Sequence, residues 1–194
     1  MVAMLNDRTS PATLLATRRS GKPRDLVAPG PDDATLDAML AIAARTPDHG
    51  KLAPWRFVVV GQDQRTALAA LIIDAYRVER PTASRTEIES LDQFAHQAPA
   101  LVVVLSSPKP SHIPVWEQEL STGAACMNLL HAVHALGFAG GWLTGWPSFS
   151  PTVRDAFGEP HERIAGFMFV GTPSRPLDER PRPVMEQVVS RWRP

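Results

Sequence analysis

The segment Ala100–Leu105 is an unbroken run of apolar residues that contains three consecutive valines. A short run of this kind, rich in β-branched residues, is typical of a strand that is covered on both faces. The chain must therefore place a layer of structure on each side of this strand. Three further segments have the composition of short strands, and they cover residues 57–60, 140–145 and 164–170.

The remaining periodic segments predict helices. Ser10-Pro11 is a helix start, because a capping hydroxyl precedes a proline at the first helical position. Strands and helices alternate without the regular rhythm of parallel βαβ units. The expected helices cover residues 12–17, Asp32 or Asp33 to Pro47, 63–80, 84–96, 120–136, and Ser150 to Gly158.

The segment Leu120–Leu136 is the most apolar of these helices, and Gly137 is placed to end it. Its many small residues predict a central helix that its neighbours approach closely. The helix is too apolar to face water, which indicates an obligate dimer. The tail after Thr172 is rich in proline, and only Val184–Trp192 has the composition to pair with or dock on another surface.

The composition excludes several classes of protein. The formal net charge is zero, so the sequence predicts no general attraction to nucleic acid or to an anionic membrane. No apolar run is long enough to span a bilayer, and residues 1–8 lack the apolar core of a signal peptide. Cys126 is the only cysteine, so no disulfide forms within the chain. We expect one domain over residues 1–194, located in the cytoplasm.

Common catalytic and nucleotide-binding motifs are missing. The sequence has no Gly-x-Gly-x-x-Gly after a strand, no Walker A loop, no His-Glu-x-x-His and no nucleophile elbow. His131 and His134 share a face of the apolar helix, but no carboxylate is near them in sequence, so we interpret them as core or interface residues. Cys126 is interpreted as a packed small residue. No metal site is expected.

Two separated fragments carry candidate binding residues. Arg18-Arg19-Ser20 follows the first helix, and a pair of cations next to a hydroxyl suits a phosphate. Arg45 and His49 lie in a turn segment that leads into the strand at residue 57. Each fragment also has a simpler interpretation, because cations are common in the last turn of a helix and a histidine is an ordinary residue for the turn at position 49.

Taken together, the two fragments resemble the nitroreductase family of flavin mononucleotide (FMN) oxidoreductases, especially its short members. The resemblance extends over roughly Thr13–Pro173 and keeps the order of the family's motifs. The further matching segments are Pro114–Glu119, Gly137-Phe138, Trp142–Gly145 and Gly166–Pro173.

The resemblance implies an α+β fold with a central, mainly antiparallel sheet flanked by helices. It also implies an intertwined homodimer with FMN bound at the interface. The residues that it assigns to FMN are Arg18, Arg19 and Ser20 at the phosphate and ribityl chain, Arg45 and His49 from the opposite subunit, Trp142, Leu143 and Thr144 along the flavin, and Arg180 or Arg182 at the phosphate.

One residue departs from the pattern that the resemblance implies. Close short relatives tend to carry a basic residue where this chain has Leu143. A positive charge at that position would stabilise reduced flavin, so the resemblance leaves redox tuning and substrate choice open.

The resemblance implies an oxidoreductase that passes electrons from NAD(P)H to a small acceptor, such as a nitroaromatic or a quinone, by a ping-pong mechanism. The chemistry would centre on the flavin, with His49 as a candidate to orient the acceptor or supply a proton. Two alternatives stay open within the resemblance: an FMN carrier without activity, and a same-fold enzyme of flavin breakdown or dehalogenation. A third alternative outside it is an apolar helical dimer without a cofactor.

Overall fold

The computed structural model describes residues 4–194, so the first three residues of the domain expected over 1–194 lie outside the description. Five strands form one sheet in the order β1-β5-β3-β2, and β4 also pairs with β5. Every pairing is antiparallel. The strands are β1 Leu26–Val27, β2 Trp55–Val60, β3 Ala100–Ser106, β4 Ala139–Leu143 and β5 Arg163–Pro173. The predicted α+β class with an antiparallel sheet is confirmed.

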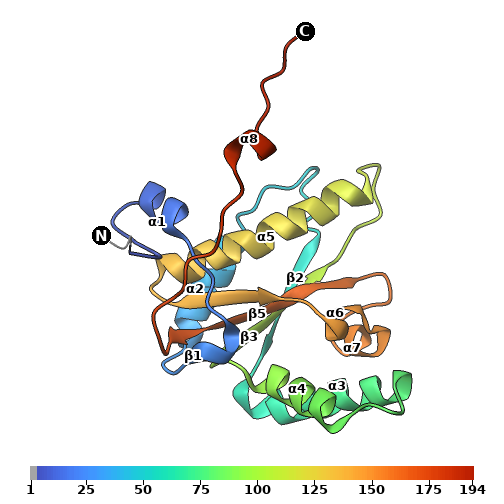
Figure 1. The fold of residues 1–194 in the computed structure, drawn as a ribbon. Helices are drawn as coiled ribbons and strands as arrows, with labels where there is room; N and C mark the ends of the chain where they lie inside the picture. Colours follow the sequence, from blue (N-terminus) through green and yellow to red (C-terminus); the bar gives the residue numbers. More distant parts are fainter. Residues whose placement is uncertain (1–3) are drawn as a thin grey trace.

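Helices cover both faces of this sheet (Figure 1). Helices α2 and α5 pack on one face, and α3, α4 and α7 pack on the other. The helices are α1 Pro11–Thr17, α2 Asp33–Ala43, α3 Arg65–Glu79, α4 Arg85–His96, α5 Val115–Ala135, α6 Trp146–Phe149, α7 Pro151–Asp155 and α8 Met185–Val188, with 3-10 turns at Pro23–Asp25 and Gln62–Gln64.

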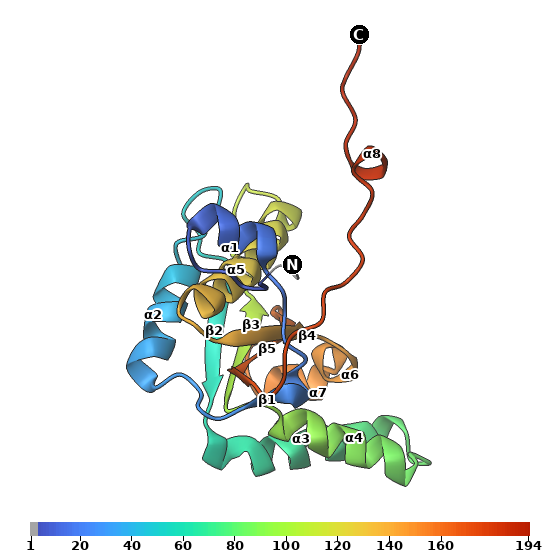
Figure 2. The same cartoon turned by 60° about the vertical axis from the view of Figure 1, so that its left-hand side comes forward.

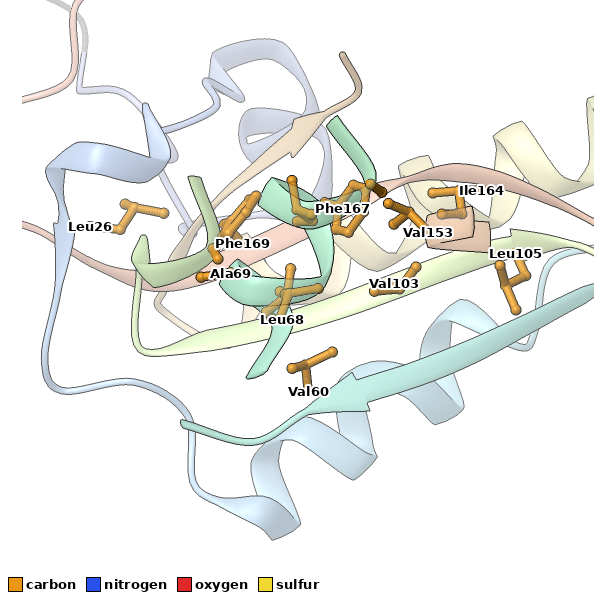
Figure 3. Close-up of a cluster of buried hydrophobic side chains, with 14 of the residues drawn as sticks. Leu26, Val60, Leu68, Ala69, Val103, Leu105, Val153, Ile164, Phe167 and Phe169 are labelled. Atoms are coloured by element: carbon orange, nitrogen blue, oxygen red, sulfur yellow. The ribbon is translucent and has the colours of Figure 1, made fainter. Parts of the chain in front are cut away.

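The strand β3 separates two hydrophobic clusters, as its unbroken apolar sequence predicts. Leu101, Val103 and Leu105 enter the cluster beneath α3 and α4, where Phe167 and Phe169 also lie (Figure 3). Val102 and Val104 enter the cluster under α2 and α5. All five β3 side chains are fully buried. Burying that much apolar surface on both faces makes β3 the centre of the fold.

Helix α5 begins earlier than the sequence predicted, at Val115 rather than Leu120. The polar residues of its first turns broke the apolar pattern, although Gln118 is buried and donates from Nε2 to the Ile113 carbonyl at 3.2 Å. Its end agrees with the prediction. Gly137 has a φ of +94°, and the amide of Phe138 donates to the Val133 carbonyl at 3.1 Å, as in a Schellman motif.

Other boundaries differ for local reasons. Helix α2 ends at Ala43, before Pro47, and the amides of Arg45 and Thr46 donate to carbonyls three residues back, so a tighter turn closes the helix. The segment predicted as a helix from residue 63 starts with the 3-10 turn Gln62–Gln64. The last predicted helix stops at Asp155 instead of Gly158. Strand β1 and helix α6 were not expected, since neither is long enough to show a period.

The tail leaves the body of the molecule (Figures 1 and 2). From Val184 onward every residue is exposed, and Trp192 is 86% exposed. The last segment, residues 184–194, therefore does not dock on its own chain. Within residues 4–194, no helix combines the length and the apolar character that crossing a membrane requires.

Candidate functional site

The segment that carries Arg18-Arg19-Ser20 is held against β4. Helix α1 is capped by Ser10, whose Oγ accepts from the Thr13 amide at 3.1 Å, and the chain then extends along the sheet. The Gly21 amide donates to the Gly140 carbonyl at 3.0 Å. A Cβ atom on Gly141 would lie 2.7 Å from the Gly21 carbonyl oxygen. Glycine at position 141 therefore permits this close approach.

Hydrogen bonds fix the two arginines of this segment. Arg18 donates from Nη1 to Ser20 Oγ at 3.1 Å. Arg19 donates from Nε to the Asp178 carbonyl at 2.7 Å, which ties the segment to the tail. The Arg19 backbone is clamped by Asn6, whose Oδ1 accepts from the Arg19 amide at 2.7 Å. Both guanidinium groups are thus positioned before any ligand is present.

The tail brings two more arginines to the same place. Arg182 donates from Nη2 to the Arg18 carbonyl at 3.2 Å and to Glu179 Oε1 at 2.8 Å. Burial lowers the pKa of Arg18, and the charges of Arg182, Arg19 and Arg180 lower it further. Four guanidinium groups from the two ends of the chain therefore lie within mutual electrostatic reach. We refer to Arg18, Arg19, Arg180 and Arg182 as the arginine cluster.

A cavity of about 590 Å³ opens beside the arginine cluster. Its apolar wall contains Met127 and Leu130 from α5 and Trp142 and Leu143 from β4. The Trp142 ring is held in place, because its Nε1 donates to the Ala165 carbonyl at 2.9 Å. A volume of this size suits a small molecule, and flat apolar walls beside a few polar groups are typical of ligand sites.

The structure divides the sequence-predicted residues into two groups. The first group lines the cavity and consists of Arg18, Arg19, Ser20, Trp142, Leu143 and Arg180. Arg182 does not line the cavity but donates to the Arg18 carbonyl. Arg45, His49 and Thr144 do not line the cavity either.

His49 lies near the first turn of α5, with Nδ1 at 2.8 Å from Glu117 Oε2. Met127 of the cavity wall is ten residues further along that helix, or about 15 Å at 1.5 Å per residue. One chain therefore does not bring His49 to the arginine cluster. The assignment of Arg45 and His49 to the site of an opposite subunit stays a prediction.

The sequence analysis did not assign the other lining residues to the site, which are Gly21, Lys22, Pro23, Arg24, Gln97, Met127, Leu130 and Gly141. Lys22 and Arg24 continue the basic character of Arg18-Arg19-Ser20, so that signal was present in the sequence. Gln97 and Met127 gave no signal, because each is brought to the cavity only by the packing of its helix.

The buried histidine and cysteine of α5 lie outside this arrangement. Burial lowers the pKa of His134 to about 4, with a further contribution from Arg18, and neither ring nitrogen has a hydrogen-bond partner among the described residues. Burial raises the pKa of the Cys126 thiol to about 12. Both residues pack in the core, as their sequence context indicated. No group of three His, Cys, Asp or Glu side chains within residues 4–194 is arranged to hold a metal ion.

The donor set of the cavity fits a phosphate monoester. Guanidinium groups form charge-assisted hydrogen bonds to phosphate oxygens, and they do so in pairs with fixed geometry. Burial, and after it the charges of the neighbouring arginines, lowers the pKa of Arg18, and a bound anion would offset both costs. The arrangement therefore suits a ligand with a phosphate at one end and a flat apolar body at the other.

Comparisons with known proteins agree with this fold. The chain matches the model of the nitroreductase family over residues 15–172. Over 165 residues it is 33% identical to the protein named "Putative NAD(P)H nitroreductase YdjA" from Escherichia coli (strain K12), a match that covers 82% of this chain and 86% of that protein. The chain belongs to the nitroreductase family, which confirms the resemblance drawn from its motifs.

Two solved structures share the fold. A nitroreductase-like family protein from Bacillus cereus superposes with a TM-score of 0.78 at 21% identity, covering 96% of this chain and 97% of that chain. A variant of the FMN- and NADPH-dependent nitroreductase NfnB from Sphigopyxis sp. strain HMH gives a TM-score of 0.73 at 19% identity, covering 93% of this chain and 98% of that chain.

Proposed function

We propose that this chain is an FMN-dependent oxidoreductase that takes electrons from NAD(P)H and passes them to a small acceptor such as a nitroaromatic or a quinone. The observation that carries the proposal is the convergence of the arginine cluster with a cavity that has an apolar wall, in a chain of this family. The relatives named as NAD(P)H nitroreductases and the FMN-dependent structural neighbour support it.

In this proposal, different residues of the cavity bind different parts of the cofactor. Arg18 and Arg19 bind the phosphate, with Arg180 and Arg182 adding positive charge from the tail. Ser20 supplies a hydroxyl beside Arg18 for the phosphate or the ribityl chain. Met127, Trp142 and Leu143 form the apolar surface against which a flavin ring packs. Bound FMN supplies the exchange of electrons between a reduced nicotinamide and an oxidised acceptor.

The chain itself excludes water from part of the cavity and orients what binds there. Leu130, Met127 and the held Trp142 ring keep one side apolar, which strengthens the electrostatic contacts at the other end. Donor and acceptor use the remaining open side in turn. No protein nucleophile is required for this chemistry.

A second copy of the chain completes the site in this proposal. Arg45, His49 and Thr144 are exposed on the single chain and stand away from the cavity. In a homodimer that brings α5 and the segment before β2 against the partner's cavity, Arg45 and His49 would reach the cofactor, and His49 would orient the acceptor or supply a proton.

The decisive experiment is the visible spectrum of the purified protein, followed by anaerobic addition of NADPH and of NADH. We expect a yellow protein with about one FMN per chain, bleached by at least one nicotinamide and recoloured by a quinone or a nitroaromatic. A colourless protein that also fails to take up added FMN would contradict the proposal. An FMN protein that neither nicotinamide reduces would instead be a flavin carrier.

A further inference from the structure

The charge that lines the cavity is strongly one-sided. Five cationic side chains line it and no carboxylate does, although the whole chain has no net charge. Arg18, Arg19 and Arg180 belong to the arginine cluster, while Lys22 and Arg24 lie further along the same segment. A single phosphate monoester carries at most two negative charges. Positive charge therefore remains in the cavity after the proposed cofactor has been bound.

Three acidic residues lie nearby, and only one of them, Asp178, is paired with a cation that lines the cavity, which is Lys22. Asp25, next to Arg24 in sequence, accepts from Arg175 Nη2 at 2.6 Å. Glu179 accepts from Arg182 at 2.8 Å, and Asp178 Oδ2 is 3.8 Å from Lys22 Nζ. Within residues 4–194, Arg24 makes neither an ion pair nor a side-chain hydrogen bond, and it is exposed at the cavity. Arg24 is thus a cation of the cavity without a counter-charge on its own chain.

We propose that this site selects electron acceptors that carry a negative charge of their own, such as aromatic carboxylates or sulfonates, and that Arg24 is the residue that sets this preference. The inference rests on the proposed function, since it concerns the second ligand of the same cavity. Gln97 lies at the same cavity, where its neutral amide adds a hydrogen-bonding group without charge.

The physical basis is long-range attraction. A cavity lined by one sign of charge, with apolar walls, raises the local concentration of oppositely charged ligands, and added salt weakens the effect. Two unit charges 4 Å apart attract by about 1 kcal/mol in water, which is about a fivefold change in binding. Since Arg24 is exposed, we expect its contribution to be of that order.

The first measurement uses ligands that cannot be reduced. Benzoate and benzamide have nearly the same shape, and only benzoate is charged at pH 7. Calorimetric titration of the FMN-loaded protein should show a benzoate preference that Arg24→Gln reduces about fivefold and that Arg24→Lys retains. High salt should also reduce the preference of the original protein for benzoate over benzamide. Arg85→Gln is the matched control, because Arg85 is an exposed arginine of α4 away from the cavity.

The second measurement follows electron transfer. The bound cofactor is first reduced with dithionite and then mixed with 4-nitrobenzoate or 4-nitrobenzamide. In each case the nitro group takes two electrons from the cofactor and two protons from solvent, and it loses one oxygen as water to give the nitroso compound. The ratio of the two second-order rate constants should fall about fivefold in Arg24→Gln. Use of this ratio removes the difference in intrinsic reactivity between the two acceptors.

The outcomes separate this inference from the proposed function. Equal ratios in Arg24→Gln and the original protein, without salt dependence, would overturn the inference while leaving an active FMN oxidoreductase in place. A protein that does not bind FMN, or whose reduced cofactor neither acceptor reoxidises, would overturn both.

Discussion

Arg18 is the residue on which the proposed cofactor site depends most. It is half-buried among three other arginines, and its guanidinium already bonds to Ser20. Burying a cation among like charges lowers stability unless a ligand compensates. The residue is therefore understandable as part of a phosphate site and would be unfavourable as a purely structural element.

We expect Arg18→Ala to weaken FMN binding by about 1.5–3 kcal/mol, the usual contribution of a hydrogen bond to a charged group. Fluorescence titration of flavin-free protein with FMN measures this. Arg85→Ala on α4 is the control and should leave the affinity unchanged.

Without FMN, Arg18→Ala should unfold at a temperature no lower than the original protein, because the substitution relieves repulsion within the arginine cluster. If FMN affinity survives the double substitution of Arg18 and Arg19, these arginines are only cations at a helix end.

His134 makes stability depend on pH. Its pKa is lowered to about 4 in the folded chain and returns to about 6.5 on unfolding, so the unfolded state binds the proton more readily. Its contribution to stability is complete above pH 6.5 and falls as the pH decreases toward 4. At pH 5 the expected loss is about 2 kcal/mol.

When the pH is changed from 7.5 to 5, the free energy of unfolding of His134→Leu should therefore rise by about 2 kcal/mol relative to that of the original protein. Urea unfolding of both proteins at the two pH values measures this difference. Leucine also removes two buried nitrogens that have no partner among the described residues. A difference between the two proteins that does not change with pH would show that the pKa of His134 is not lowered in the folded chain.

The residues of the site differ in how visible they are in sequence. Arg18, Arg19 and Ser20 are consecutive and form a phosphate-binding pattern, so the motif was visible in the sequence, and the structure places all three at the cavity. Their binding of FMN stays a prediction. Arg180 lies in a proline-rich tail, and only the resemblance suggested it. Nothing in the sequence indicated that Met127 lines the cavity. A methionine in an apolar helix cannot be told from a core residue until the packing of that helix is known.

At the scale of elements, the contact between residues 20–23 and β4 positions the arginines. The chain can approach β4 so closely only because residue 141 has no side chain. Gly141→Ala should push the segment outward, reducing FMN affinity without altering any charged group.

Gly61→Ala is the matched control for this prediction. Its new methyl group, after the end of β2 and away from the cavity, would meet the movable side chains of Asp63 and Gln64. Parallel FMN titrations and thermal unfolding of the two variants measure the effect. Equal FMN affinity in Gly141→Ala and the original protein would show that this contact does not position the arginines.

The elements with a clear period or a continuous apolar pattern were predicted from sequence. Strand β3 is an example, because its burial on both faces follows from six apolar residues in succession. The predicted start of α5 was wrong, since the polar residues Glu117, Gln118 and Glu119 interrupt the apolar pattern there. Strand β1 has only two residues, and its pairing with the end of β5 depends on tertiary structure alone.

At the scale of the whole molecule, two features call for a second copy of the chain. Strand β2 is at an edge of the sheet, bonded only to β3 among the described strands. The tail exposes Val184, Met185, Val188, Val189 and Trp192. An unpaired edge and an exposed apolar segment are both costly in water, and pairing between copies would remove both costs.

We therefore expect a dimer at micromolar concentration in analytical ultracentrifugation. Removal of residues 184–194 should weaken that dimer and lower FMN content, while the remaining chain keeps its far-UV circular dichroism. A truncated monomer that binds FMN as tightly as the full chain would contradict a site shared between subunits.

The net charge calculated from the composition describes the chain as a whole and does not describe the cavity. A net charge of zero predicted no general affinity for polyanions, yet it concealed a cavity lined by cations and no acids. Local charge depends on which distant segments meet, and the meeting of residues 18–24 with the tail is a property of the fold.

The two halves of the arginine cluster have very different positions in the order of synthesis. Arg18 leaves the ribosome before any strand of the sheet, whereas Arg182 follows all of them and still reaches the Arg18 carbonyl. The complete cluster cannot exist on a nascent chain until the sheet has been made. In the proposed site, binding of a phosphate by all four arginines is therefore a late event in biosynthesis. A chain interrupted after β5 would have the fold but would lack two of the four proposed phosphate-binding arginines.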